Sequence, residues 1–336
     1  MLFGMRRLVF GLYPGGMAGG ETGLLSGPPD DPARVRSCLD ELQGNCRPFV
    51  VRCYDSFQDP DSPLAVTPCA PLDYLQYAVS EVRPLELVLQ FRSASGNVSG
   101  FVDFVRLRLE RCHPYLYSVQ ITEEANSADG PPVIDGPYPN VLRALVEGIA
   151  AAKAFLQASE RPEVKFGFNA TPTFGPGAQF WSRLTGMGES LVESLDYVGL
   201  DFFPDVFRLL APDGQPGDLR SSVTGVLETM RSIWLPAAGI PERVPIHITE
   251  HGWPTGAGRH PERQAQVLDM VIRTVHDAGD RLNIERYMLF ALRDVEQSRA
   301  TNRNNLFCFF GITTADYAHK PAFRIFRSLI QELGMQ

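Results

Sequence analysis

The sequence lacks a long apolar run. No stretch approaches 18 uninterrupted apolar residues, which is about the length that a transmembrane helix needs. The apolar run after Arg6 and Arg7 stops after about six residues, at Tyr13, and is shorter than the apolar part of a signal peptide. We interpret this run as a first strand, and we expect a cytoplasmic protein with no membrane partner.

Basic residues are too few to dominate the charge. There are 31 Lys and Arg against 39 Asp and Glu, and the formal net charge is −8. Nucleic acids and anionic membranes bind clusters of Lys and Arg, so we expect neither as a partner. A neutral or cationic ligand fits this balance better. Nothing in the sequence indicates the oligomeric state.

Cysteine is scarce as well, with six in 336 residues and no Cys-x-x-Cys pair. This absence argues against a zinc ribbon and against a thioredoxin-type motif. Scattered cysteines in a chain of this size are usually reduced, so we expect free thiols. A P-loop, a kinase signature and a nucleophilic serine elbow are missing too, which argues against those three kinds of enzyme.

The sequence does contain a series of short β-rich segments. Most are continuously apolar, as expected for parallel strands that are buried on both faces. We predict strands at residues 8–12, 48–53, 85–91, 115–122, 164–168, 197–202, 244–249 and 286–291. Helical patterns lie between them at residues 32–42, 98–112, 141–158, 262–277 and 322–333. Eight alternating units predict an α/β fold, a (β/α)8 TIM barrel in a single domain over residues 1–336.

A doubly wound open sheet is the alternative fold. It would usually place a Gly-x-Gly-x-x-Gly loop after an early strand, and none follows the first strand here. Segments rich in Pro and Gly follow several strands, at residues 127–140, 171–177, 211–218 and 253–260. In a barrel these are the loops that build the active-site face.

Two glutamates stand directly after buried strands. Glu124 follows the fourth predicted strand and Glu250 follows the seventh. The carboxyl ends of barrel strands share one mouth, so the two side chains can meet there. Glycoside cleavage needs two carboxylates, one as general acid and base and one as nucleophile or base. The alternative is that both are solvent-exposed loop acids.

The segments around these glutamates resemble clan A of the glycoside hydrolases. Residues 121–126, Ile-Thr-Glu-Glu-Ala-Asn, are similar to the Asn-Glu-Pro segment of the clan, with Glu124 at its acid/base position. Residues 248–255 resemble the nucleophile strand of families 39 and 17, and Arg52 resembles the arginine that supports the nucleophile. Residues 197–204, 290–294 and 311–322 resemble later parts of the clan's barrel. The resemblance implies a retaining β-glycosidase that acts on a carbohydrate or glycoside and needs no metal or other cofactor.

Two positions depart from the pattern of the clan. Glu123 stands where the clan has an Asn that binds the sugar 2-hydroxyl. Because neighbouring strand residues face opposite ways, Glu123 could face outward and pair with a cation, or it could face the sugar and alter recognition there. Phe203 stands where the clan has a Tyr that donates to the nucleophile, and a phenyl ring cannot donate. Tyr54, Tyr287 and His251 are candidates for the missing donor.

Further side chains near the strand ends are candidates for sugar contacts. The full set of candidates for substrate binding is Arg52, Tyr54, Glu123, Asn126, Asn169, Asp201, Phe203, Trp253 and Arg293. Trp253 could stack on a sugar ring or pack in a loop. Arg293 could contact the sugar or form an internal salt bridge with Asp294.

Two other functions remain open. A catalytically silent barrel that binds carbohydrate would have the same polar mouth. A metal-dependent hydrolase using His247 and His251 would match the pattern His-x-x-Glu-His, but that chemistry needs a helix. On a strand the two residues lie about 13 Å apart, which one zinc ion cannot bridge.

Overall fold

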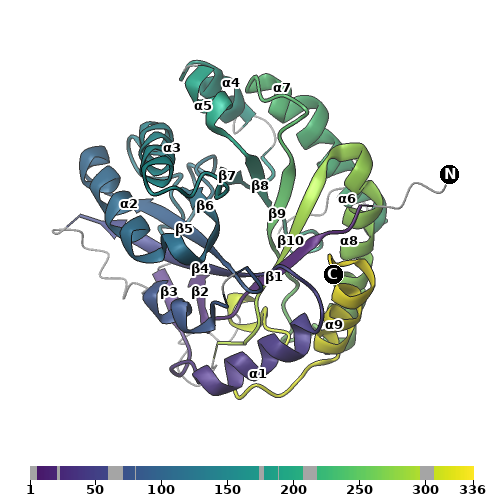
Figure 1. Cartoon of the computed structure of the whole chain (residues 1–336). Coiled ribbons are helices and arrows are strands. Elements are labelled where there is room, and N and C mark those ends of the chain that lie inside the picture. Colours follow the sequence, from purple (N-terminus) through teal and green to yellow (C-terminus); the bar gives the residue numbers. More distant parts are fainter. Residues whose placement is uncertain are drawn as a thin grey trace.

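The computed structural model describes residues 6–20, 23–59, 71–79, 81–173, 178–187, 189–206, 218–295 and 306–336. Eight parallel strands form a closed barrel in the order β1-β10-β9-β8-β7-β6-β5-β4, which confirms the predicted (β/α)8 fold (Figure 1). The strands are β1 (Val9–Tyr13), β4 (Phe49–Gln58), β5 (Leu85–Arg92), β6 (Leu116–Ile121), β7 (Lys165–Ala170), β8 (Tyr197–Asp201), β9 (Ile246–His251) and β10 (Ile284–Phe290). The prediction of one domain over the whole chain stays a prediction.

All eight predicted strands are present, and their ends agree to within two residues except in β4. That strand continues to Gln58, five residues beyond its predicted end, and stays paired with β5 throughout, from Val51 opposite Leu85 to Gln58 opposite Arg92. The second half of β4, residues 54–58, reads Tyr-Asp-Ser-Phe-Gln and is mostly polar, so it lacks the continuous apolar run that the prediction used.

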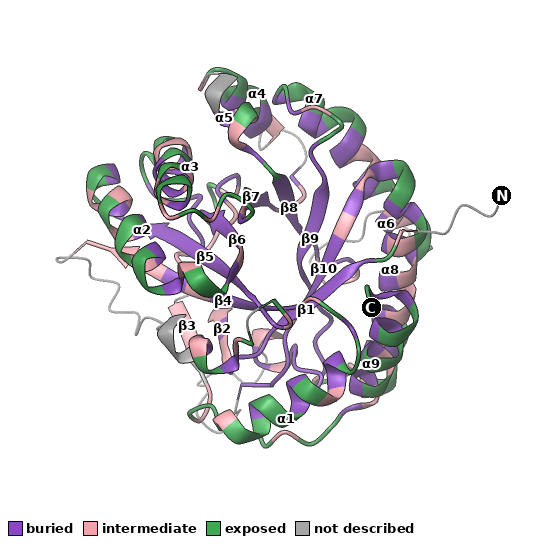
Figure 2. Ribbon diagram, in the orientation of Figure 1, coloured by how far each residue is buried: buried purple, intermediate pink, exposed green. Residues whose placement is uncertain are grey.

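Helices surround the barrel and bury only their inner faces (Figure 2). The main helices are α1 (Pro32–Gln43), α2 (Val98–Cys112), α3 (Val141–Ala158), α6 (Leu219–Thr229), α8 (Pro261–Leu282) and α9 (Pro321–Leu333). Shorter helical pieces are α4 (Gln179–Thr185), α5 (Glu189–Ser194), α7 (Leu235–Ala237), η1 (Pro71–Tyr77), η2 (His113–Tyr115), η6 (Leu306–Phe309) and the π-helical η4 (Met230–Trp234). The bounds of α2 and α3 match the prediction, whereas α4 to α7 were not predicted.

A short antiparallel hairpin was also missed by the sequence analysis. It consists of β2 (Met17–Gly20) and β3 (Gly23–Ser26), and it follows β1 at the carboxyl end of the barrel. Glycine is depleted in strands, so the three glycines of this hairpin give little sequence signal for it. The hairpin matters for function because Met17 and Leu24 help to line the pocket described below.

The described cysteines are all free, as expected: Cys38, Cys46, Cys53, Cys112 and Cys308. Cys69 lies outside the described residues. No helix in the described part of the chain is long and apolar enough to cross a membrane.

Candidate active site

A pocket of about 320 Å³ opens at the carboxyl ends of the barrel strands. Its volume lies at the small end of the range that is usual for ligand sites. Tyr54, Glu123, Glu124 and Glu250 line it, and so do the hairpin, the 127–140 loop and a group of aromatic rings. The two glutamates singled out from the sequence therefore share one cavity.

The backbone turns sharply where β6 ends, and this turn places Glu124. Thr122 and Glu124 have φ values of 66° and 46°, in the left-handed region that costs energy for residues other than glycine. The Asn169 side chain at the end of β7 accepts the Glu124 backbone N–H at 2.8 Å. This side-chain oxygen of Asn169 therefore binds the backbone of Glu124 and does not point to a ligand.

Glu123 faces the barrel interior, so the inward orientation is the one present of the two that the sequence left open. Face alternation applies only within a regular strand, and the left-handed Thr122 interrupts the strand just before Glu123. The carboxylate of Glu123 accepts hydrogen bonds from Gln120 at 2.7 Å, from Asn169 at 3.1 Å and from Arg52 at 3.4 Å. Glu123 therefore does pair with a cation, which is Arg52, and this pair lies inside the site.

Glu250, at the end of β9, is 9% exposed. The Tyr54 hydroxyl donates a hydrogen bond to its Oε1, and Nη2 of Arg52 lies 3.6 Å from the same oxygen. Tyr54 is therefore the residue that donates to Glu250 where Phe203 cannot. Another candidate for this role, Tyr287, contacts His251 instead.

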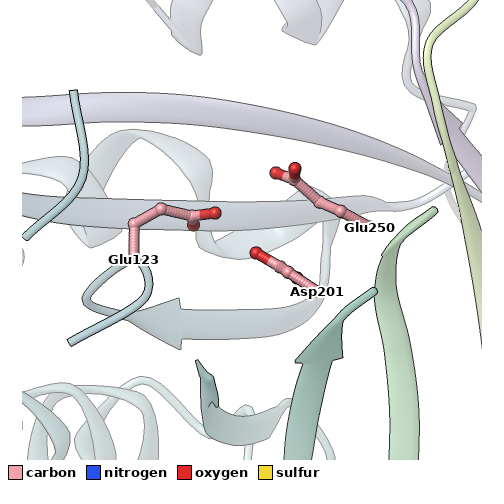
Figure 3. Close-up of side chains that lie close together, drawn as sticks. All are labelled: Glu123, Asp201 and Glu250. Atoms are coloured by element: carbon pink, nitrogen blue, oxygen red, sulfur yellow. The ribbon is translucent and has the colours of Figure 1, made fainter. Parts of the chain in front are cut away.

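Three carboxylates converge beside the pocket, as Figure 3 shows. Oxygens of Glu123, Asp201 and Glu250 all lie within 4.8 Å of one another. Asp201, at the end of β8, accepts hydrogen bonds from the Thr249 hydroxyl at 2.6 Å and from Asn169. The three oxygens could hold a cation, but donors of the chain already engage each carboxylate. In the described residues no other group of three His, Cys, Asp or Glu side chains has such spacing.

The pKa values of Glu124, Glu250 and Asp201 are all raised. Burial and the Glu123 carboxylate raise the pKa of Glu124 to about 8. Burial and Glu123 also raise the pKa of Glu250, while Arg52 and the Tyr54 hydroxyl act to lower it. Burial and Glu250 raise the pKa of Asp201. Because the groups are close together, their titrations are linked, and Glu124 keeps its proton near neutral pH.

A buried ionic network centred on Glu86 holds Arg52 in place. Glu86 on β5 accepts hydrogen bonds from Arg52 and from Arg286, both at 2.7 Å, and from Ser118 at 3.0 Å. Burial opposes ionisation of Glu86, but Arg286 and Arg52 lower its pKa to about 2. Glu86 thus keeps a full negative charge in the barrel interior and fixes the guanidinium that faces Glu250.

Two expected sugar contacts point elsewhere. Trp253 is 4% exposed, its Nε1 donates to Asp205 at 3.2 Å, and the Arg259 guanidinium covers its ring at 4.7 Å. Arg293 donates to Asp30 at 2.8 Å and does not form the expected pair with Asp294. Both side chains are held in loop packing, and neither lines the pocket.

The other candidates divide between the pocket and its supports. Phe203 lines the pocket and packs edge-on against Phe310 and Phe290, with ring centroids 5.4 and 6.3 Å apart. Asn126 is buried, and its side chain binds the backbone of Thr171 through both N–H and C=O. Asn126 therefore ties the loop after β6 to the loop after β7.

His247 and His251 both lie on β9, and their side chains contact different residues. His247 stacks on Tyr197 at 4.3 Å between centroids and contacts Arg286 at 2.9 Å, whereas His251 contacts the Tyr287 hydroxyl. Burial lowers the pKa of both imidazoles to about 3. They do not face a common point, so the geometry for a shared metal ion is missing in this pair.

Sequence reasoning missed several residues of the site. Asp135, in the loop after β6, accepts the backbone N–H groups of Phe91 at 2.7 Å and Glu123 at 2.8 Å, so it joins two strand ends. Gln90 and Arg92 line the pocket from β5. The available signal was a polar residue at every second position near the end of an apolar strand, which places both side chains on the inner face.

No protein-family model matches the chain, and no curated protein matches it. Solved structures share its fold. A family 39 glycoside hydrolase from Bacteroides cellulosilyticus WH2 matches with a TM-score of 0.62 and 14% identity, over 97% of this chain and 63% of that one. A GH2 β-galacturonidase from Eisenbergiella tayi matches at 0.61 and 13%, over 98% and 51%. A β-glucosidase from Exiguobacterium marinum matches at 0.57 and 13%, over 88% and 86%. The chain spans about half the length of several matching proteins, including the β-galacturonidase, and at this identity the likeness shows the fold.

Proposed function

We propose that this protein is a retaining glycoside hydrolase of clan A that cleaves a β-glycosidic bond, with residues 1–336 as one catalytic domain. The observation that carries the proposal is that Glu124 and Glu250 line one pocket from two barrel strands with contacts that suit different roles. The raised pKa of Glu124, about 8, keeps a proton available at neutral pH. Tyr54 and Arg52 face Glu250 and stabilise its charged form.

The chemistry proceeds in two balanced steps. First, an oxygen of Glu250 attacks the anomeric carbon while Glu124 gives its proton to the glycosidic oxygen, so the old C–O bond breaks and a glycosyl ester forms. Second, Glu124 takes a proton from water, the hydroxyl attacks the anomeric carbon, and Glu250 leaves. Burial and Glu250 raise the pKa of Asp201, so protonation of Asp201 would favour the charged form of Glu250.

Support from the comparisons is limited to the fold. The solved structures that match include a family 39 glycoside hydrolase, a β-galacturonidase and a β-glucosidase, which act on glycosides. The barrel hosts many chemistries, so the carboxylates carry the proposal and the fold only agrees with it.

The test is release of nitrophenol from a panel of aryl β-glycosides: glucoside, galactoside, xyloside, fucoside and glucosaminide. We expect Glu250→Gln to lower kcat by several orders of magnitude, because the nucleophile is lost. The exposed Glu110 of α2 offers a matched control, and Glu110→Gln should leave kcat unchanged. Binding of glycosides without turnover by the wild type would instead favour a catalytically silent barrel.

A second experiment separates the roles of the two glutamates. Glu124→Gln removes the proton donor, so it should slow a poor leaving group such as methanol far more than dinitrophenol, which leaves without protonation. Glu250→Gln should slow both equally. Proton NMR of the first sugar released should show the β-anomer; the α-anomer would contradict the double displacement.

A further inference from the structure

Arg92 is the only Lys, Arg or His among the described residues that line the pocket. It ends β5, and its side chain is 2% exposed. By strand alternation Arg92 shares the inner face of the barrel with Gln90 and Glu86. It is paired across the strands with Gln58, and Gln90 with Ser56. The cation therefore stands at the mouth, above the polar layer that fixes Arg52.

The guanidinium of Arg92 is only partly satisfied. Its Nη2 donates to Gln90 Oε1 at 2.7 Å and to the Val133 carbonyl at 2.5 Å. Its Nε and Nη1 are buried and have no hydrogen-bond partner in the described part of the chain. A buried donor without an acceptor costs about 1–3 kcal/mol, more when it is charged, so this group needs an explanation.

Several other buried arginines are paired with carboxylates, whereas Arg231 instead donates to three backbone carbonyls. Arg52 and Arg286 each lie 2.7 Å from Glu86, and Arg293 lies 2.8 Å from Asp30. Arg92 has no carboxylate oxygen within 4.0 Å in the described residues. A buried cation without a counterion is costly, and a ligand anion would remove that cost.

Asp135 is the carboxylate whose charge acts most on Arg92. Its Oδ2 is taken by two backbone N–H groups, those of Phe91 and Glu123, which tie the loop to the barrel. Burial raises the pKa of Asp135 to about 7, so its charge is incomplete at neutral pH. Asp135 therefore does not neutralise Arg92 through a direct ion pair.

We propose that Arg92, assisted by Ser56 and Gln90, binds an anionic substituent of the glycoside, a carboxylate or a sulfate ester, at the β4–β5 side of the pocket. The substrate class is then an acidic glycoside. This inference rests on the proposed function, since Glu124 and Glu250 would act on the same molecule. The Ser56 hydroxyl donates to Gln90 Oε1 at 2.7 Å and Arg92 donates to the same oxygen, so the three side chains form one connected polar wall.

Matched substrate pairs test the inference with the wild type. We expect kcat/KM to be about 10- to 100-fold higher for an aryl β-glucuronide than for the aryl β-glucoside, the range that hydrogen bonds to a charged group supply. An aryl β-galactoside and its 6-sulfate form the second pair, and they separate a sulfate ester from a carboxylate. Equal rates within both pairs would overturn the inference.

The variant Arg92→Gln should lose this preference, because kcat/KM should fall by a larger factor for the anionic member of each pair than for the neutral member. Arg92→Lys keeps the charge and should retain part of it. An equal decrease in kcat/KM on charged and neutral substrates would show that Arg92 has a structural role, and it would refute the assignment. Unfolding temperatures of both variants identify a variant that fails to fold, in which case the wild-type pairs decide.

Binding by calorimetry separates this inference from the proposed function. Glucuronate should bind to the wild type and to Glu250→Gln, and should bind at least about tenfold more weakly to Arg92→Gln, while glucose does not show this dependence. If glucuronate binds through Arg92 but no glycoside is hydrolysed, hydrolysis is wrong and the anion site stands. If neutral glycosides are hydrolysed and Arg92→Gln has no selective effect, hydrolysis stands and the anion site is wrong.

Discussion

Glu123→Gln tests the electrostatics of the site most directly. The substitution removes a negative charge and keeps the length of the side chain. Oxygens of Glu123 and Glu250 lie within 4.8 Å of each other. At that separation and an effective dielectric constant of about 20, two like charges repel by about 3 kcal/mol. Removal of this repulsion favours the charged form of Glu250, so we expect the pKa of Glu250 to fall.

The sign of the effect follows from the role of each group. The rate needs protonated Glu124, so it falls as the pH rises through the pKa of that group, which is about 8 in the wild type. The rate needs ionised Glu250, so it falls as the pH drops through the raised pKa of Glu250. Glu123 raises both pKa values, and its removal moves both limbs of the profile to lower pH.

The assay is kcat/KM against pH, between about pH 4 and 10, on the best aryl glycoside of the panel, because this ratio reports the ionisations of the free enzyme. The exposed Glu110 provides the matched control, since Glu110→Gln removes the same charge far from the mouth. Limbs that stay in place, or that move to higher pH, would refute the reasoning that Glu123 sets these pKa values.

Three further outcomes are expected. Tyr54→Phe removes the hydroxyl that donates to Glu250, so kcat should fall about 10- to 100-fold and the acid limb should move to higher pH; an unchanged profile would count against the contact. Glu86→Gln removes the negative charge that pairs with the buried guanidinium groups of Arg52 and Arg286. It should lower the free energy of unfolding in urea by about 3–5 kcal/mol. Gly252→Ala places a Cβ 1.8 Å from the Phe290 carbonyl oxygen, so soluble yield and the unfolding temperature should both drop clearly; a wild-type unfolding temperature would show that the backbone relaxes freely.

Much of the site could be located from strand ends alone. Glu124, Asp201 and Glu250 each stand where a buried strand stops, and parallel barrel strands bring such positions to one mouth. The same reasoning could not orient Trp253 or Arg293. Their directions depend on loops that follow β9 and β10, and loop conformation is decided by contacts that are distant in the sequence.

The sequence by itself determined the barrel and the end of the barrel at which the site lies. Continuous apolar segments alternating with amphipathic helices can bury their faces only as a parallel sheet covered by helices, and eight units close it. Only the tertiary structure decided which side chains meet. The turn at Thr122 carries Glu123 inward, and Tyr54 reaches Glu250 from a strand 196 positions away. Two nitrogen atoms of the Arg92 guanidinium have no hydrogen-bond partner among the described residues. These pairings depend on register and on a local left-handed backbone, because side-chain contacts between distant strands have no periodic signal in the sequence.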